Sequence, residues 1–183
     1  LVSAVALKAN RVSIKQPILS TKARTLASLG SELVSARVQP LEYFAVADWQ
    51  SDSAKVLHEL SRQFGVAKPL VVRSSALNED SGTASLAGHY TTVLNIQGAR
   101  ALQSAIIEVI ESYGSEANSL DEVLVQPMLA DVRLSGVAFS HDPATGSPYR
   151  VVNYATGSDT TAVTSGAEQA RTYVVAPGVQ NVP

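Results

Sequence analysis

The chain has 183 residues and 45% of them are hydrophobic, so it is long enough for one large domain or two small lobes with a buried core. Charged residues make up only 16% and the formal net charge is -2, which argues against a surface for binding nucleic acid or an anionic membrane. The absence of cysteine excludes disulfides, thiolate nucleophiles and zinc-thiolate sites, and it fits a reducing, cytoplasmic compartment.

The chain has no apolar run approaching the roughly 20 residues of a membrane helix, so we expect a soluble protein. Residues 1–7 are mildly apolar, but no basic segment precedes them and no cleavage signature follows, which disfavours a signal peptide. A start at Leu1 instead of methionine suggests that the sequence has been trimmed.

The spacing of apolar residues predicts a mixed α/β chain of the α+β kind, with helices in its first part. Residues 20–36 have helical spacing, and either Ser20 or Thr21 can serve as the N-cap. Further elements are expected in this order: a strand over 38–46, a helix from a cap at Ser51 to Gly65, a strand at 70–72, an extended segment at 90–96, and a helix over 99–113.

The last third of the chain is predicted to be rich in strands. These are expected at residues 123–128, 135–140, 149–154 and 172–175, with turn-forming residues at 142–146. We therefore divide the chain into residues 1–19, which carry no usable motif, a first lobe at 20–114 and a second lobe at 115–183. The boundary between the lobes is placed in the polar stretch 115–121.

The most informative segment is residues 72–88, where an arginine emerges from a buried strand into a loop of hydroxyls and glycines. Arg73, Ser74 and Ser75 open this segment, and Gly82 and Gly88 lie further along it. A triphosphate requires a fixed cation and many small donors near the backbone, and this segment supplies both. On composition alone, an ordinary exposed serine-rich loop is the commoner interpretation.

Residues 72–95 resemble, without a gap, the signature of the phosphoenolpyruvate synthase and pyruvate phosphate dikinase family. Three further matches occur in the family's order: Thr21 to Ala23 around a phosphate-binding lysine, 125–128 at an adenine-side hinge, and 135–139 in the strand that follows. The resemblance covers residues 20–166. It implies a two-lobed ATP-grasp-like fold, incomplete at its C-terminus, and an ATP-dependent phosphotransferase.

A narrower resemblance is to the family members that phosphorylate an amide or amino acid in capsule synthesis, of the glutamine kinase type. It rests on residues 76–80, 141–149 and 163–166.

The resemblance also implies roles for individual residues. Arg73 would be catalytic and stabilise the charge that develops on the transferred phosphate, whereas its structural alternative is a salt bridge. Lys22 would bind phosphate from the opposite side, although the family's usual glycines are replaced by Thr21 and Ala23; the alternative is an exposed helix lysine. The other implied nucleotide-binding residues are Ser74, Thr92, Gln126, Pro127 and Met128.

For Thr92 and for the segment 126–128 a structural alternative stays open. Thr92 could be an ordinary strand threonine, and 126–128 could be the end of a core strand. If the hinge assignment holds, its backbone would meet the adenine edge while apolar side chains pack on the faces of the ring.

ATP-dependent transfer also requires Mg²⁺, and the family's metal-binding pattern does not occur in the 183 residues, so the ligands are expected beyond residue 183. None of the three histidines resembles the family's phosphate carrier. The expected partners are a nucleotide and a small-molecule acceptor bound by further domains. The acceptor could be pyruvate, an amide or amino acid, or a carrier histidine, and the chain alone should be inactive.

The alternative is a nucleotide-sensing or interaction module that kept the fold without the chemistry. In either case residues 78–88 are expected to act as a lid over the phosphates.

Overall fold

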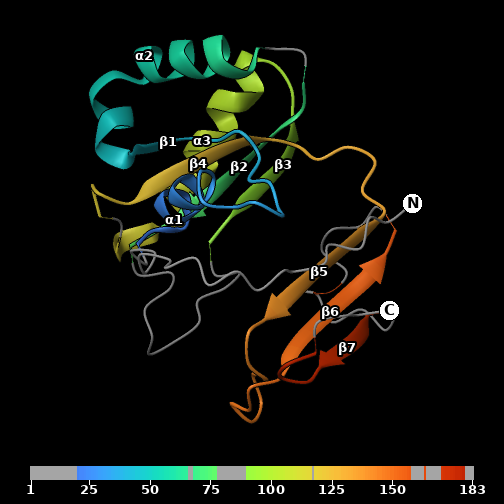
Figure 1. Cartoon of the computed structure of the whole chain (residues 1–183). Helices are drawn as coiled ribbons and strands as arrows, with labels where there is room; N and C mark the ends of the chain where they lie inside the picture. The colour runs from blue at the N-terminus through green and yellow to red at the C-terminus, as the bar shows by residue number, and fades with distance from the viewer. Residues whose placement is uncertain are drawn as a thin grey trace. The chain divides into compact units, whose positions relative to one another are not determined.

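The computed structural model describes residues 20–65, 68–77, 90–116, 118–157, 163 and 170–179, which form a mixed α/β structure with two antiparallel sheets (Figure 1). The chain separates into two compact units, and the boundary between them lies between Met128 and Leu129. Residues 1–19 and the expected lid at 78–88 lie outside the described residues.

The N-terminal unit is built on a four-stranded antiparallel sheet with the order β1-β4-β2-β3. Its strands are β1 (Glu42–Ala45), β2 (Leu70–Ser75), β3 (Thr92–Ile96) and β4 (Glu122–Pro127). β4 lies between β1 and β2, although it follows both in the chain. The sheet therefore depends on contacts between distant parts of the sequence.

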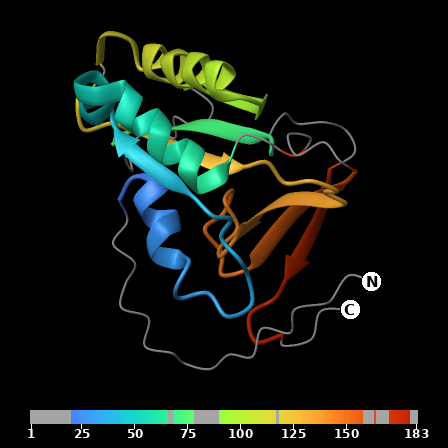
Figure 2. The ribbon, with the colours of Figure 1, turned by 90° about the horizontal axis from the view of Figure 1, so that it is seen from above.

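The helices α2 (Val46–Phe64) and α3 (Ala99–Ser112) cover one face of this sheet (Figure 2). Val72 is paired with Val125 on one side and Val93 on the other, so these three side chains point to the same face. They pack with apolar residues of both helices, among them Leu60 and Ile106, in the main hydrophobic core. The short 3₁₀ helix η1 (Gly114–Glu116) follows α3.

The helix α1 (Lys22–Leu29) lies on the opposite face of the sheet, against β4 (Figure 2). Thr21, one of the two predicted candidates, is its N-cap, because its hydroxyl accepts a hydrogen bond from the backbone N–H of Arg24. Ala23 and Leu124 are fully buried on this side.

Two helix boundaries differ from the sequence predictions. α1 ends at Leu29 and not near residue 36, and Leu33 beyond it is 40% exposed. α2 begins at Val46 and not after Ser51, because the Asp48 carboxylate accepts the Ala45 N–H at 3.1 Å and caps the helix there.

The helical conformation of α2 breaks near the predicted cap, but one residue later. Asp52 has extended dihedrals, with φ -154° and ψ 81°, and its side chain accepts the Lys55 N–H at 2.9 Å. Asp52, and not Ser51, therefore caps the second part of this helix.

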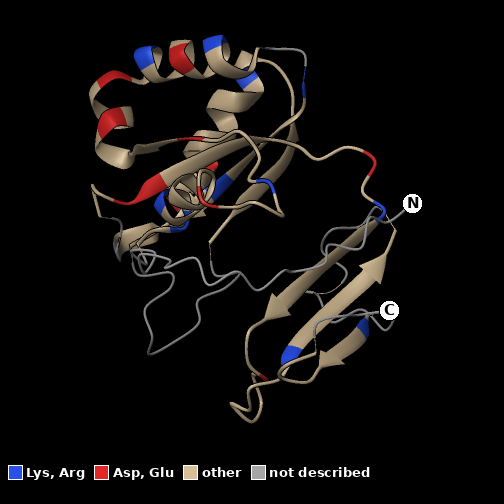
Figure 3. Cartoon of the chain, viewed as in Figure 1, with Lys and Arg blue, Asp and Glu red and all other residues tan. Residues whose placement is uncertain are grey.

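The C-terminal unit contains a three-stranded antiparallel sheet of β5 (Leu134–Phe139), β6 (Arg150–Thr156) and β7 (Arg171–Val175). Arg150 and Arg171 are the two charged residues within these strands (Figure 3). The predicted turn between β5 and β6 is confirmed: the Gly146 N–H donates to the Asp142 carbonyl at 2.8 Å, and Gly146 has a φ of 69° that glycine favours.

The two units divide after β4, whereas the sequence analysis places a lobe boundary in 115–121. The difference arises because β4 pairs with both β1 and β2 and so belongs to the N-terminal sheet. None of the described helices has both the length and the apolar character needed to cross a lipid bilayer.

Candidate nucleotide site

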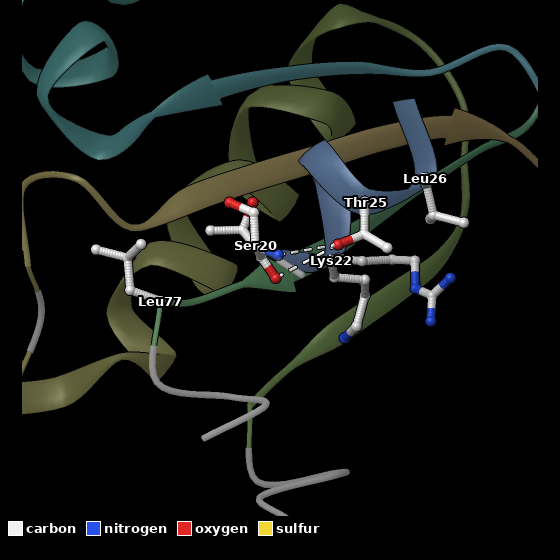
Figure 4. A pocket seen from close by; sticks show the side chains of 7 residues that line it. Ser20, Lys22, Thr25, Leu26 and Leu77 are labelled. Carbon is white, nitrogen blue, oxygen red and sulfur yellow. Dashed lines mark hydrogen bonds between the residues drawn. The ribbon is translucent and has the colours of Figure 1, made fainter. Parts of the chain in front are cut away.

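A cavity of about 670 Å³ lies in the N-terminal unit, between the start of α1 and β2 (Figure 4). The described residues that line it are Ser20, Thr21, Lys22, Thr25, Leu26, Arg73 and Leu77. Two of these side chains are cationic, three carry hydroxyls and two are apolar. The described lining contains no carboxylate, so its charge is positive.

Lys22 is the first residue of α1 and is half-buried. Its Nζ donates to the backbone carbonyl of Ser74 at 3.4 Å, which places the ammonium beside the end of β2. Figure 4 shows the Lys22 side chain extending from the beginning of the helix, next to Ser20 and Thr25. The structure thus brings Lys22 and the β2 arginine to one cavity.

Arg73 lies on the α1 side of the sheet, since its partner in the β2–β4 register is Leu124 and the strand alternates from Val72, which faces the α2–α3 core. Its guanidinium forms no ion pair or hydrogen bond with another residue in the described ranges. Within that part of the chain, the alternative interpretation of Arg73 as half of a structural salt bridge has no support.

Thr92 is the direct cross-strand partner of Arg73. Directly opposed residues of an antiparallel pair have Cβ atoms only about 5 Å apart and point to the same face. Thr92 is exposed there, although it is not among the described residues that line the cavity. Thr92 therefore lies beside Arg73 on the face of the sheet that carries α1.

Ser74 is placed differently from its neighbour. Its side chain is 1% exposed and points to the opposite face from Arg73, because successive residues of a strand alternate. The part of Ser74 that reaches the cavity side is the carbonyl that accepts from Lys22.

The expected adenine hinge, residues 126–128, forms the C-terminal end of the N-terminal unit. Gln126 pairs with Val71 and so shares the face of Arg73, two residues along β2. Met128 donates its N–H to the Pro69 carbonyl at 2.9 Å, and Pro127 has no N–H. A hydrogen bond from this segment to an adenine edge therefore cannot use the Met128 N–H while that bond is intact.

A buried polar network holds the start of α1 next to the cavity. The Glu122 carboxylate is 2% exposed and accepts one hydrogen bond from the Thr21 hydroxyl and another from Arg24 Nε at 2.6 Å. The Ser75 hydroxyl accepts the Ala23 N–H at 2.9 Å.

The hydrogen bond to Glu122, and then the attraction of its charge, raise the pKa of the Arg24 guanidinium above its ordinary value. Since that value is already far above neutral pH, Arg24 stays protonated and the ion pair persists.

Tyr113 connects this network to α3. Its hydroxyl donates to the Glu122 carbonyl at 2.5 Å and accepts the Ser75 N–H at 3.0 Å. These bonds satisfy backbone groups at the end of β2 and the start of β4, where the ladder gives way to loops.

The sequence of the chain matches that of a known protein family. Residues 47–182 match the sequence pattern described as "Pyruvate phosphate dikinase, AMP/ATP-binding domain". The chain belongs to this family. It is therefore a nucleotide-binding domain of the kind found in phosphoenolpyruvate-utilising phosphotransferases, which confirms the family predicted from the sequence. The matched range of this AMP/ATP-binding domain includes Arg73, Thr92 and 126–128 but not Lys22.

A relative of the AMP/ATP-binding domain is the prodigiosin synthesizing transferase PigC of Serratia marcescens. The two are 34% identical over 100 residues, which is 50% of this chain and 11% of that protein. The chain thus spans about a tenth of the length of this curated relative.

Two solved structures are similar at low identity. A Pyrococcus horikoshii protein has 17% identity and a TM-score of 0.48, over 84% of this chain and 56% of its own. A dinucleotide-forming acetyl-coenzyme A synthetase 1 of Candidatus Korarchaeum cryptofilum, solved with coenzyme A and Ca-AMPCP, has 14% identity and a TM-score of 0.49, over 88% and 61%. Both TM-scores are below 0.5, so neither structure informs the ligand of this AMP/ATP-binding domain.

The described residues of the AMP/ATP-binding domain do not include a cluster of three or more His, Asp or Glu side chains able to hold a metal ion. The set that lines the cavity fits a phosphate group and not a magnesium ion, because it offers ammonium, guanidinium and hydroxyl donors.

Sequence reasoning missed Glu122, Arg24 and Tyr113. A signal was present for Glu122, since Asp121 and Glu122 directly precede a fully apolar run, Val123 to Val125, and a carboxylate entering a buried strand requires partners. The identity of those partners could not be inferred, because Thr21 is 101 positions away.

Proposed function

We propose that the chain is the ATP-binding part of a phosphotransferase and that Lys22 and Arg73 hold the phosphates from two sides. The observation that carries this proposal is their convergence: one comes from the first turn of α1 and the other from β2, and both line the same cavity. Two fixed cations at one cavity suit a polyanionic ligand, since like charges are otherwise kept apart.

The dimensions and chemistry of the cavity support a nucleotide. Small-molecule sites usually enclose about 300–1,000 Å³, and the volume of about 670 Å³ lies in this range. The Ser20 hydroxyl adds a small donor at its edge, whereas the Thr21 hydroxyl already donates to Glu122. Ser20 and Thr25 also bond each other, with the Thr25 hydroxyl donating to the Ser20 carbonyl at 3.4 Å (Figure 4).

The two cations have different roles in the proposed mechanism. Arg73 has a planar guanidinium that can bind two phosphate oxygens at once. We therefore assign it the role of stabilising the charge that develops on the transferred phosphoryl group. Lys22 is a compact charge and is assigned to the phosphates that stay with the nucleotide. Thr92 is proposed to donate its hydroxyl to a phosphate oxygen beside Arg73.

A magnesium ion bound with the nucleotide would offset part of the charge of the phosphates. The chain's own residues bind and orient the phosphates in this proposal. Gln126 and Met128 are proposed to approach the adenine from the end of β4, with the Gln126 side chain on the Arg73 face.

For the whole protein we propose an ATP-grasp-like kinase. The acceptor is proposed to be pyruvate, an amide or amino acid such as glutamine, or a carrier histidine, and to be bound outside this chain. Turnover should therefore require the longer protein, whereas nucleotide binding should not.

Calorimetry on the 183-residue chain tests the binding proposal. ATP should bind, and adenosine should bind more weakly because it lacks the phosphates. Lys22→Ala and Arg73→Ala should each weaken ATP binding about tenfold, the range of one charge-assisted hydrogen bond, and leave adenosine binding unchanged. Lys55→Ala and Arg100→Ala serve as matched controls, since both side chains are exposed on α2 and α3. Equal affinity of wild type and both variants for ATP would refute the site.

The sensing-module alternative makes a different prediction for the longer protein. A kinase should form a phosphorylated product from pyruvate or glutamine, detectable by phosphorus NMR. A module that binds ATP with the same dependence on Lys22 and Arg73, yet gives no product with any acceptor or on its own histidines, would support the sensing function.

A further inference from the structure

The residues on both sides of Lys22 in the chain are attached to one carboxylate. The Thr21 hydroxyl and Arg24 Nε donate to the two different oxygens of Glu122, which lies at the start of β4. Lys22 lies between them at the first position of α1. The carboxylate is therefore held by both ends of the short segment whose lysine reaches the cavity.

The burial of Glu122 restricts where the first turn of α1 can lie. With 2% of its surface exposed, the carboxylate cannot rely on water to satisfy its oxygens, so losing a partner carries a full desolvation cost. Arg24 is 60% exposed and Thr21 is buried, so one hydrogen-bond donor to Glu122 lies at the surface and the other in the interior. Only a narrow range of positions of the first turn of α1 preserves both bonds.

The rest of the first turn is fixed to the same place. The Ala23 N–H donates to the Ser75 hydroxyl, and Tyr113 links the Ser75 N–H to the Glu122 carbonyl. Ser75 lies two residues beyond Arg73 on β2 and on the same face. One hydrogen-bond network therefore fixes the position of the Lys22 backbone relative to β2, the strand that carries Arg73.

We propose that Glu122 is a positioning residue for Lys22, which sets the direction from which the ammonium approaches the phosphates next to Arg73. The proposal rests on the nucleotide site proposed above, in which Lys22 touches phosphate and Glu122 does not. Glu122 holds Thr21 and Arg24, and these residues fix the position of Lys22 between them. Its effect on ATP binding therefore depends on Lys22.

A double-mutant cycle measures this dependence. Glu122→Gln keeps the volume and an acceptor but loses the charge, and it should weaken ATP binding about three- to tenfold in the chain with Lys22. In the Lys22→Ala background the same substitution should cost less than about twofold, because the ammonium it positions is gone. Adenosine affinity should be unchanged in all four proteins. A structural effect on the whole cavity would instead be additive and would also weaken adenosine.

A second pair of variants covers the case in which Glu122→Gln does not fold. Thr21→Val removes the donor to Glu122 and should weaken ATP binding in the same Lys22-dependent way, whereas Thr21→Ser keeps the hydroxyl and should restore it. Val109→Ala, in the core on the other face of the sheet, is the matched control: it should lower the midpoint of thermal unfolding without changing the affinity for ATP.

The outcomes separate the two proposals. If Lys22→Ala leaves ATP affinity unchanged, the proposed phosphate site is wrong and this inference falls with it. If Lys22→Ala weakens ATP binding while the Glu122 and Thr21 variants do not, or do so equally with and without Lys22, the site stands and the positioning role is refuted.

Discussion

Arg73 and Thr92 face each other across β2 and β3, as direct partners in the antiparallel register. Both point to the face of the sheet that carries α1, and neither side chain is fully buried. The long cationic side chain of Arg73, which lines the cavity, thus has a short hydroxyl side chain beside it on the same face. The family resemblance implies a role beside the phosphates for both residues.

Replacing Thr92 should have a smaller effect than replacing either cation. Thr92→Val removes the hydroxyl with little change of shape and should weaken ATP binding about threefold to tenfold, the range of one hydrogen bond. Strand stability should hold, because valine favours strands. Thr92→Ser should retain most of the affinity, and an equal loss in the valine and serine variants, measured by calorimetry, would contradict a role for the hydroxyl.

Arg73 should matter more for transfer than for binding in the longer protein. Arg73→Ala should lower kcat by a factor on the order of 10² or more, because the guanidinium stabilises charge that grows in the transition state. Arg73→Lys should recover only part of the rate, since an ammonium cannot make the bidentate contact. Steady-state rates with saturating ATP test this, and a variant that changes only KM would remove Arg73 from the chemical step.

Gly136 should be intolerant of a side chain. A Cβ at this position would lie 2.5 Å from the Asn153 carbonyl oxygen on the paired strand β6, so the β5–β6 ladder would have to shift. Gly136→Ala should lower the free energy of unfolding by about 1–3 kcal/mol. Thermal or urea unfolding would reveal the loss as a lower midpoint.

Gly30 provides the matched substitution. It has helical dihedrals, with φ -54° and ψ -34°, and an added Cβ would make only ordinary contacts at 3.5 Å or more. Gly30→Ala should therefore be neutral or stabilise by up to about 1 kcal/mol, because alanine restricts the unfolded chain. A comparable loss of stability in both alanine variants would show that the close approach at Gly136 is not the cause.

The contribution of Arg24 to stability should be independent of pH near neutrality. The pKa of its guanidinium is raised in the folded state, chiefly by the hydrogen bond to Glu122, so folding is favoured by the protonated form. Such a contribution is complete below the unfolded pKa and is lost only as pH rises through the higher folded pKa, far into the alkaline range. The difference in unfolding free energy between wild type and Arg24→Gln should stay constant between about pH 7 and 10. A marked slope in that difference would contradict the assignment.

The sequence by itself determined the local structure and the family. Apolar spacing located the strands and helices, Thr21 was one of two predicted caps and proved to be the N-cap of α1, and the residues around Arg73 led to the correct nucleotide-binding family. These features depend on neighbours within a few positions, or on a motif of fixed residues, and a single sequence records both.

Only the tertiary structure decided which residues meet. Strand alternation implies that Arg73 and Ser74 face opposite ways, but not which of the two faces receives α1. The packing of α1 against β4 shows which face this is, and it brings Thr21 to Glu122, across 101 positions of chain. The physical reason is that β-sheet pairing and burial of a carboxylate are decided by partners brought together in space, and no local pattern of residues identifies those partners.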